Sequence, residues 1–202
     1  MSDTRRPSDV RQVELVDAAL HLIATRGIAA LTTRSLAEQV GLSSGAIFRH
    51  FPSLEAVLEA VVSRVEVVLD STYPEPALPP AEKLERFIEA RSTAVGKQVG
   101  ILRLVQSEQF LLALPKNGSE RLSACVQRTR SFITECLREG QEAGQIRADL
   151  PADTLAPIVM GTVQMLALST AGARQRTSES QRVRESMMTL LRPPPITKSS
   201  RK

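Results

Sequence analysis

The stretch GIAALTTRSLAEQVGLSSGAIFRHFPSL, residues 27 to 54, decides how this chain folds. Thr32 and Ser43 carry hydroxyls of the kind that cap helix N-termini, and each precedes a short run with apolar residues at helical spacing. Gly41 is placed to end the first run, and Pro52 ends the second because its nitrogen has no hydrogen to donate. The stretch therefore predicts two short helices joined by a tight turn.

The flanking sequence predicts a longer helix on each side of this pair. From about residue 10 to residue 26, apolar residues recur three and four positions apart, and Gly27 follows as a C-terminal stop. After Ser53, which is another capping residue, the apolar residues from Leu54 to Val68 keep the same helical spacing. A supporting helix followed by two short helices with a tight turn between them forms a helix-turn-helix unit.

The rest of the chain also has a helical pattern, and no strand pattern is present. Four prolines between residues 71 and 80 form a stiff connector. Pro115–Gly118 reads as a turn. Further helices are expected over residues 81–97, 99–114, 119–143, 151–171 and 177–191. We predict an all-α fold of about nine helices, with a three-helix N-terminal domain and a larger helical domain.

The composition excludes several classes of protein. The 202 residues are 42% hydrophobic, which is enough to bury a core, and charges interrupt every long apolar run, so no membrane span is expected. The N-terminus lacks the apolar core of a secretory signal, and we expect a cytoplasmic protein. The net charge of +4 is concentrated after Gly172, where eight residues are basic and two acidic. Overall basicity therefore does not by itself indicate DNA binding.

The sequence gives no sign of catalysis or of a metal site. His21 and His50 have no Cys or His at metal-ligand spacing. No nucleophile stands beside a general base and no glycine-rich phosphate loop is present, so we expect neither an enzyme nor a bound cofactor. Cys125 and Cys136 would lie about 16 Å apart along one helix, too far for a disulfide. They are either small buried apolar residues or redox sensors.

A dense set of residues between positions 10 and 58 follows one known pattern at the same spacing. They are Gly27, Leu31–Arg34, Leu36–Ala37, Gly41–Ser43, Ile47–Ser53 and Glu55. These residues closely resemble the DNA-binding domain of TetR family transcriptional regulators. The resemblance implies a homodimer whose paired helix-turn-helix units dock in successive major grooves of a palindromic operator on double-stranded DNA. It also implies a C-terminal region that forms the dimer and encloses a small effector, whose binding shifts the fourth helix and releases the DNA.

The resemblance suggests four parts of the chain. They are a disordered arm over residues 1–9, a helix-turn-helix DNA-binding domain over 10–52, a helical effector-binding and dimerisation domain over 53–192, and a disordered tail over 193–202. The expected function is that of a ligand-responsive dimeric repressor. The alternative is a DNA-binding protein of the same fold whose C-terminal region recruits a protein partner instead of a small effector.

The residues expected to contact DNA lie on the second and third helices. A guanidinium can bond guanine O6 and N7 together, so Arg34 and Arg49 are candidate base readers. Phosphate contact is the alternative for each, and Arg34 also fits a solvated surface charge. Two departures from the family pattern, Phe48 for Tyr and Leu54 for Lys, remove phosphate contacts. Arginines of the N-terminal arm are candidates to replace them. The predicted set is Thr32, Thr33, Arg34, Ser43, Ser44, Gly45, Ala46, Phe48, Arg49 and His50.

Two further sites are predicted on the later helices. The effector-pocket candidates combine apolar walls with a few polar groups, although most of them also fit ordinary core or surface positions. They are Phe87, Arg91, Leu104, Glu108, Phe110, Phe132, Met160, Gln164 and Met165. The helix over residues 155–171 is apolar on most sides, which indicates either a buried core helix or a dimer interface shared with the last helix. The interface candidates are Gly161, Ala167, Ala171, Met187, Leu190 and Leu191.

Overall fold

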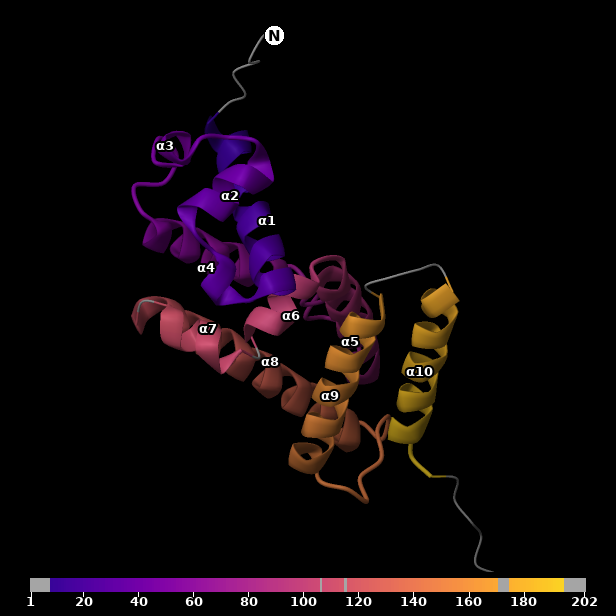
Figure 1. Ribbon diagram of the computed structural model, residues 1–202. Coiled ribbons are helices and arrows are strands. Elements are labelled where there is room, and N and C mark those ends of the chain that lie inside the picture. The colour runs from indigo at the N-terminus through magenta and orange to yellow at the C-terminus, as the bar shows by residue number, and fades with distance from the viewer. Residues whose placement is uncertain (1–7, 106, 115, 171–174, 195–202) are drawn as a thin grey trace, which may run out of the picture. The chain divides into compact units, whose positions relative to one another are not determined.

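The computed structural model describes residues 8–105, 107–114, 116–170 and 175–194 (Figure 1). These residues hold ten α-helices, α1 to α10, together with the short 3-10 helix η1, and they contain no strand. The predicted all-α fold is confirmed. None of the helices in the described ranges is long and apolar enough to cross a membrane.

Packing divides the chain into two compact units. The first comprises Met1–Ser71 and Lys97–Val126, and the second comprises Thr72–Gly96 and Gln127–Lys202. These units are defined by which residues pack together, whereas the predicted boundary after residue 52 separates a DNA-binding domain from an effector-binding domain. That functional division stays a prediction.

The first unit is assembled around α1. It contains α1 (Ser8–Arg26), η1 (Ile28–Ala30), α2 (Thr33–Val40), α3 (Ser44–Ile47), α4 (Leu54–Asp70), α6 (Val99–Val105), α7 (Glu108–Ala113) and the first part of α8 (Lys116–Glu142). α1 packs against α2, α4 and α6. Leu15 and Ala19 on α1 are completely buried, as are Leu36 on α2 and Val61 on α4. The apolar stripe that predicts α1 from the sequence is therefore the face that holds this unit together.

The second unit consists of α5 (Pro80–Lys97), the remainder of α8, α9 (Ala152–Thr170) and α10 (Gln175–Leu191). α9 and α10 lie side by side, in orange and yellow in Figure 1. Its hydrophobic core draws Phe87 from α5, Ile133 from α8, Val159 from α9 and Met187 from α10. Each of the four helices contributes, so the unit depends on contacts between residues far apart in sequence.

Two predicted helix boundaries are wrong. Residues 99–114 form two helices, α6 and α7, because Ser107 caps α7: the Phe110 N–H donates to the Ser107 Oγ at 3.2 Å. The turn predicted over Pro115–Gly118 is mostly helix, since α8 begins at Lys116. Asparagine and glycine are weak helix formers, but this preference is small and tertiary packing overrides it here.

The third helix is shorter than predicted. α3 spans only Ser44–Ile47, after which the chain continues in tighter turns. The Arg49 N–H donates to the Ala46 carbonyl at 3.2 Å, and the His50 N–H donates to the Ile47 carbonyl at 2.9 Å. Bonds of this i to i+3 type are those of a 3-10 turn, and the approaching Pro52 prevents an α-helix from continuing.

Candidate nucleic-acid interface

Side-chain caps build the α2–α3 pair. Thr32 and Ser35 form a reciprocal capping box, in which the Ser35 N–H donates to Thr32 Oγ1 at 3.1 Å and the Thr32 N–H donates to Ser35 Oγ at 3.0 Å. Ser43 caps α3, because its Oγ accepts the Ala46 N–H at 3.3 Å. Gly41 ends α2 in the left-handed conformation, with φ of 68°. The predicted caps and the predicted stop are confirmed.

Buried side chains fix this pair from behind. Leu36 and Ile47 are 0% and 2% exposed, and Phe51 is also buried. A polar tie adds to this packing, because Gln12 Nε2 on α1 donates to the His50 carbonyl oxygen at 3.0 Å. The recognition turn, residues 48–51 after α3, is therefore held against α1 by apolar burial and by a long-range hydrogen bond. Sequence reasoning missed Gln12, since a glutamine on a helix carries no pattern of its own.

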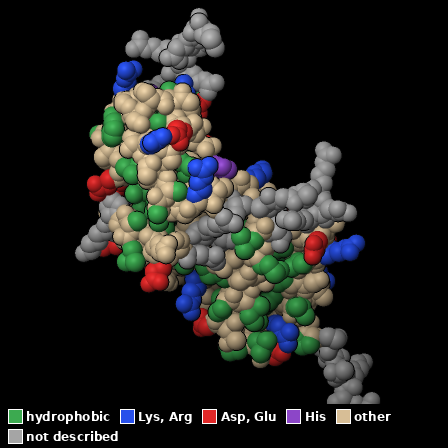
Figure 2. All heavy atoms as spheres, viewed as in Figure 1, with side chains coloured by type: hydrophobic (Ala, Val, Ile, Leu, Met, Phe, Trp, Pro, Cys, Tyr) green, Lys and Arg blue, Asp and Glu red, His purple; other side chains and the backbone are tan. Residues whose placement is uncertain are grey.

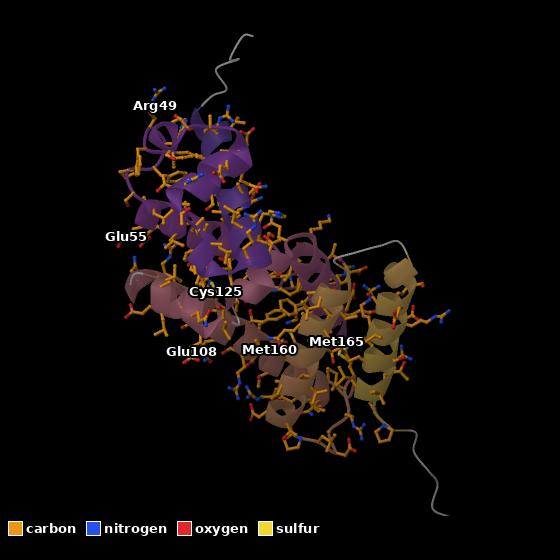
Figure 3. The ribbon with its side chains drawn as sticks, in the orientation of Figure 1. Arg49, Glu55, Glu108, Cys125, Met160 and Met165 are labelled. Atoms are coloured by element: carbon orange, nitrogen blue, oxygen red, sulfur yellow. The ribbon has the colours of Figure 1, made fainter. Side chains whose placement is uncertain are left out.

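All the predicted DNA-contacting residues reach the surface. The Arg34 side chain is 86% exposed, and Phe48 is 52% exposed. Figure 3 shows Arg49 at the tip of the first unit, pointing away from it. Thr32, Ser43, Ser44 and Gly45 are exposed, whereas Thr33, Ala46 and His50 are half-buried. Most of the other residues in the predicted set have short side chains, which permits close approach of a groove surface.

Arg34 forms an ion pair along its own helix. Its Nε donates to Glu38 Oε1 at 2.9 Å, and both side chains are well exposed. Exposed pairs four residues apart stabilise a helix by only about 0.3–0.5 kcal/mol. The bond uses Nε, whereas the two terminal nitrogens of the guanidinium are suited to guanine O6 and N7. The pair is therefore compatible with base reading by Arg34.

The two departures from the family pattern both lie at or near the surface. The exposed ring of Phe48 offers an apolar edge that suits a thymine methyl group, in place of a hydroxyl that would bond phosphate. Leu54 is half-buried at the first position of α4. Neither residue supplies charge, so the arginines carry the electrostatic part of this surface.

The predicted effector-pocket residues are divided between the units. Leu104 and Phe110 are buried in the first unit, where Glu108 is exposed. Met165 of the second unit is also exposed, and Figure 3 labels it together with Glu108 and Met160. The members in the second unit are Phe87, Arg91, Phe132, Met160, Gln164 and Met165.

An aromatic cluster in the second unit contains three of the predicted pocket residues. Arg91 is only 4% exposed, and its Cζ lies 4.9 Å from the ring centroid of Phe87 and 5.2 Å from that of Tyr73. The centroids of Phe87 and Phe132 are 4.8 Å apart. The prediction omitted Tyr73, which is half-buried against the core of the second unit, because its position in a proline-rich connector gave no sign of such packing.

The predicted dimer residues have different environments. Gly161 and Leu190 are exposed. Ala171 lies outside the described residues. The other predicted members, Ala167, Met187 and Leu191, are buried within the second unit. Large exposed hydrophobic residues on α9 that the prediction omitted are Ile158 and Leu168.

A metal centre has no support in the described ranges. Within them, no three His, Cys, Asp or Glu side chains lie close enough together to hold a metal ion.

Comparisons with known proteins agree with this geometry. Residues 15–61 match the family described as bacterial regulatory proteins, tetR family. The chain is 28% identical over 169 residues to the HTH-type transcriptional repressor KstR2 of Mycolicibacterium smegmatis, covering 79% of each chain. It is 36% identical over 138 residues to the nucleoid occlusion factor SlmA of Vibrio campbellii, covering 64% of this chain and 67% of the relative.

The fold is also similar to that of a solved regulator. The structure of AibR in complex with isovaleryl coenzyme A and operator DNA matches with a TM-score of 0.74 at 15% identity, covering 92% of this chain and all of the other. The chain belongs to the tetR family of bacterial regulatory proteins, a class of helix-turn-helix transcriptional regulators that bind DNA.

Proposed function

We propose that this protein is a homodimeric repressor that binds a palindromic operator through α2 and α3 and leaves it when a small effector binds. The observation that carries the proposal is the α2–α3 surface itself. Arg34 extends into solvent from the capped helix α2, and Arg49 extends from the turn that follows the capped helix α3. Leu36 and Ile47 are buried and fix the orientation of the two helices. A rigid pair with exposed guanidinium groups is suited to reading base edges in a major groove.

The exposed face of α9 supports the dimer. Ile158, Met165 and Leu168 are 59%, 50% and 46% exposed, and their spacing puts them along one side of the helix. Figure 2 shows hydrophobic side chains gathered over this part of the second unit. Single exposed apolar residues are ordinary, but a row of them indicates an interaction surface. Gly161, within the row, permits close approach of the same face from a second copy.

The Arg91 cluster supports a small effector. A buried guanidinium packed on the faces of Phe87 and Tyr73 gives the predicted pocket a charged group within aromatic walls. AibR, which has a similar fold, was solved with both an acyl coenzyme A and operator DNA. We therefore propose that the second unit binds an effector beside Arg91.

Selection of bound duplexes from random DNA tests the operator proposal. The wild-type protein should enrich an inverted repeat, and the Arg34→Ala/Arg49→Ala double variant should lose nearly all affinity for it. An Arg86→Ala/Arg138→Ala variant is the matched control, because it removes two exposed arginines that pair within their own helices. Enrichment of no sequence, or equal binding by the two double variants, would contradict the proposal.

A second candidate function is recruitment of a protein partner, which the 36% identity to the nucleoid occlusion factor SlmA favours. The two candidates differ in what changes DNA binding. A screen of cell metabolites should find a molecule that raises the melting temperature and weakens binding to the selected repeat. If no small molecule does either, and a pull-down captures one specific protein, the second candidate replaces effector control.

A further inference from the structure

Arg121 on α8 contacts three residues of α4 within the first unit. Its Nη2 donates to the Ser63 Oγ at 2.9 Å and also to a carboxylate oxygen of Glu66. Its Nε donates to the other Glu66 oxygen at 3.1 Å, and its Nη1 lies 3.5 Å from a Glu59 oxygen. All three nitrogens of one guanidinium are therefore used on a single neighbouring helix.

The three partners form a matched face. Glu59, Ser63 and Glu66 are spaced four and three residues apart, so they lie on one side of α4. The side chains of Arg121 and Glu66 are only 29% and 22% exposed, which reduces screening by water. The forked contact with Glu66 is of the strong bidentate type. The hydrogen bonds that Arg121 donates to Glu66 also raise the pKa of Arg121 above its ordinary value.

The two helices also meet through apolar contact that does not need Arg121. Gly118 lies one turn before Arg121 on α8, and a Cβ at Gly118 would be 3.5 Å from Val62 Cγ2 on α4. Val62 itself is completely buried. This apolar contact therefore remains when the arginine is replaced, whereas the arginine fixes the position of one helix along the other. An Arg121→Met variant should fold, because its side chain can cover the same apolar stem region.

The contact between Arg121 and α4 lies where it can influence DNA binding. α4 begins at Leu54, just after the recognition turn, so a displacement of α4 moves α3. α8 continues beyond Val126 into the second unit. Arg121 therefore joins α4, the helix that follows the α2–α3 pair, with α8, the helix whose later residues belong to the second unit.

We propose that Arg121 is a positioning residue: by holding α4 to α8 it sets the placement of the two DNA-reading pairs in the dimer. The inference rests on the proposed dimeric function. A contact of this kind governs binding to two half-sites together, because that binding requires both pairs at the correct spacing. It has little influence on binding to one half-site, which needs only the contacts of a single pair.

The test compares Arg121→Met with wild type on two duplexes, the inverted repeat selected by the wild-type protein and a single half-site cut from it. The variant should bind the full repeat about tenfold more weakly, which corresponds to about 1.4 kcal/mol, and should bind the half-site equally well. The control is Arg138→Met on the same helix, whose pair with Glu135 lies within α8. It removes the same charge and should change neither affinity.

A Glu59→Gln/Glu66→Gln variant separates this effect from general electrostatics. It makes the protein more positive, so charge attraction alone predicts tighter binding to DNA. Loss of the Arg121 contact predicts weaker binding to the full repeat instead. This variant also decides the question if Arg121→Met fails to fold, as judged by circular dichroism.

Two results would overturn the inference while leaving the proposed function intact. One is unchanged affinity of both variants for the full repeat. The other is an equal fall in affinity for the repeat and for the half-site, which would mean that Arg121 supports the fold of the α2–α3 pair within one subunit. If the wild-type protein selects no repeat at all, the proposed function itself fails.

Discussion

The α2–α3 surface of the first unit and the α9 face of the second unit expose opposite kinds of side chain. In the first, apolar residues such as Leu36 and Ile47 are buried, and Arg34, Ser44 and Arg49 extend outward. In the second, the core is filled and a row of large hydrophobic residues, including Ile158, remains in solvent. Exposed polar groups are well solvated. Removing exposed apolar area from water is favourable by about 25 cal/mol per Å², so a partner that covers it is stabilised. The comparison teaches that one surface suits a hydrated, charged polymer and the other suits protein.

The largest expected effect comes from placing a charge on the α9 face. Ile158→Arg should convert the dimer to a monomer, since a guanidinium cannot be buried against an apolar partner without a counter-charge. Binding to the full repeat should fall by roughly 10²–10⁴-fold, because linked binding of two heads is lost. Light scattering and fluorescence anisotropy measure the two changes. Leu112→Arg, at an 80% exposed position on α7, is the control and should change neither. A dimeric Ile158→Arg protein would show that α9 is not the interface.

The next effect concerns the DNA surface directly. Arg34→Ala should cost about 1–3 kcal/mol in binding to the selected repeat, and discrimination at one base pair should be relaxed if Arg34 reads a base. Titration against repeats that carry each substituted base pair measures this. Arg86→Ala removes an arginine in a similar exposed i,i+4 pair and should have no effect. A uniform loss across all the substituted repeats would assign Arg34 to phosphate.

A smaller effect follows from restoring the family residue at the start of α4. Leu54→Lys should add a cationic phosphate contact, which tightens binding and makes the salt slope steeper by about 0.9 per subunit. The slope is measured from affinities between low and physiological salt. Leu112→Lys adds the same charge on α7 and should leave the slope nearly constant. No change in slope for Leu54→Lys would place this residue away from the DNA backbone.

The smallest effect concerns a buried thiol in the second unit. Burial raises the pKa of Cys136 well above its ordinary value, to about 11. The thiol therefore stays protonated at neutral pH, and the native protein should react very slowly with a thiol reagent at this position. The pKa of Cys136 is higher in the folded protein than in the unfolded chain. The contribution of the protonated thiol to the stability of the fold is therefore complete below the ordinary pKa of a thiol and is lost as the pH rises toward 11. A Cys125→Ala protein that still reacts rapidly at pH 7 would favour the redox-sensor alternative.

Local signals were sufficient to predict the elements of the helix-turn-helix. Thr32, Gly41 and Ser43 act through atoms within a few residues of themselves, as the capping hydrogen bonds confirm. The length of α3 and the break between α6 and α7 were not predicted. Both depend on competition between a weak local preference and hydrogen bonds to particular neighbours, and periodicity does not reveal which of them prevails.

The predicted sites divide in the same way. Arg34 and Arg49 were identified because the sequence predicted both on short helices with one buried side, and both are exposed, although Arg49 lies in the turn after α3. On α9, which is apolar on most sides, periodicity did not separate the buried Ala167 from the exposed Ile158. Burial on such a helix is decided by the helices that pack against it, so some of the candidate interface residues are buried and others are exposed.

By itself the sequence determined the all-α class, the capped helix pair and the residues that this pair exposes, because short-range spacing and capping chemistry govern each of them. Only the tertiary structure decided that Gln12 donates a hydrogen bond to the turn after α3 and that Arg121 contacts three residues of α4. It also decided that one side of α9 exposes large hydrophobic residues. These contacts join residues far apart in the chain. Their formation depends on how whole helices pack, which no local pattern specifies.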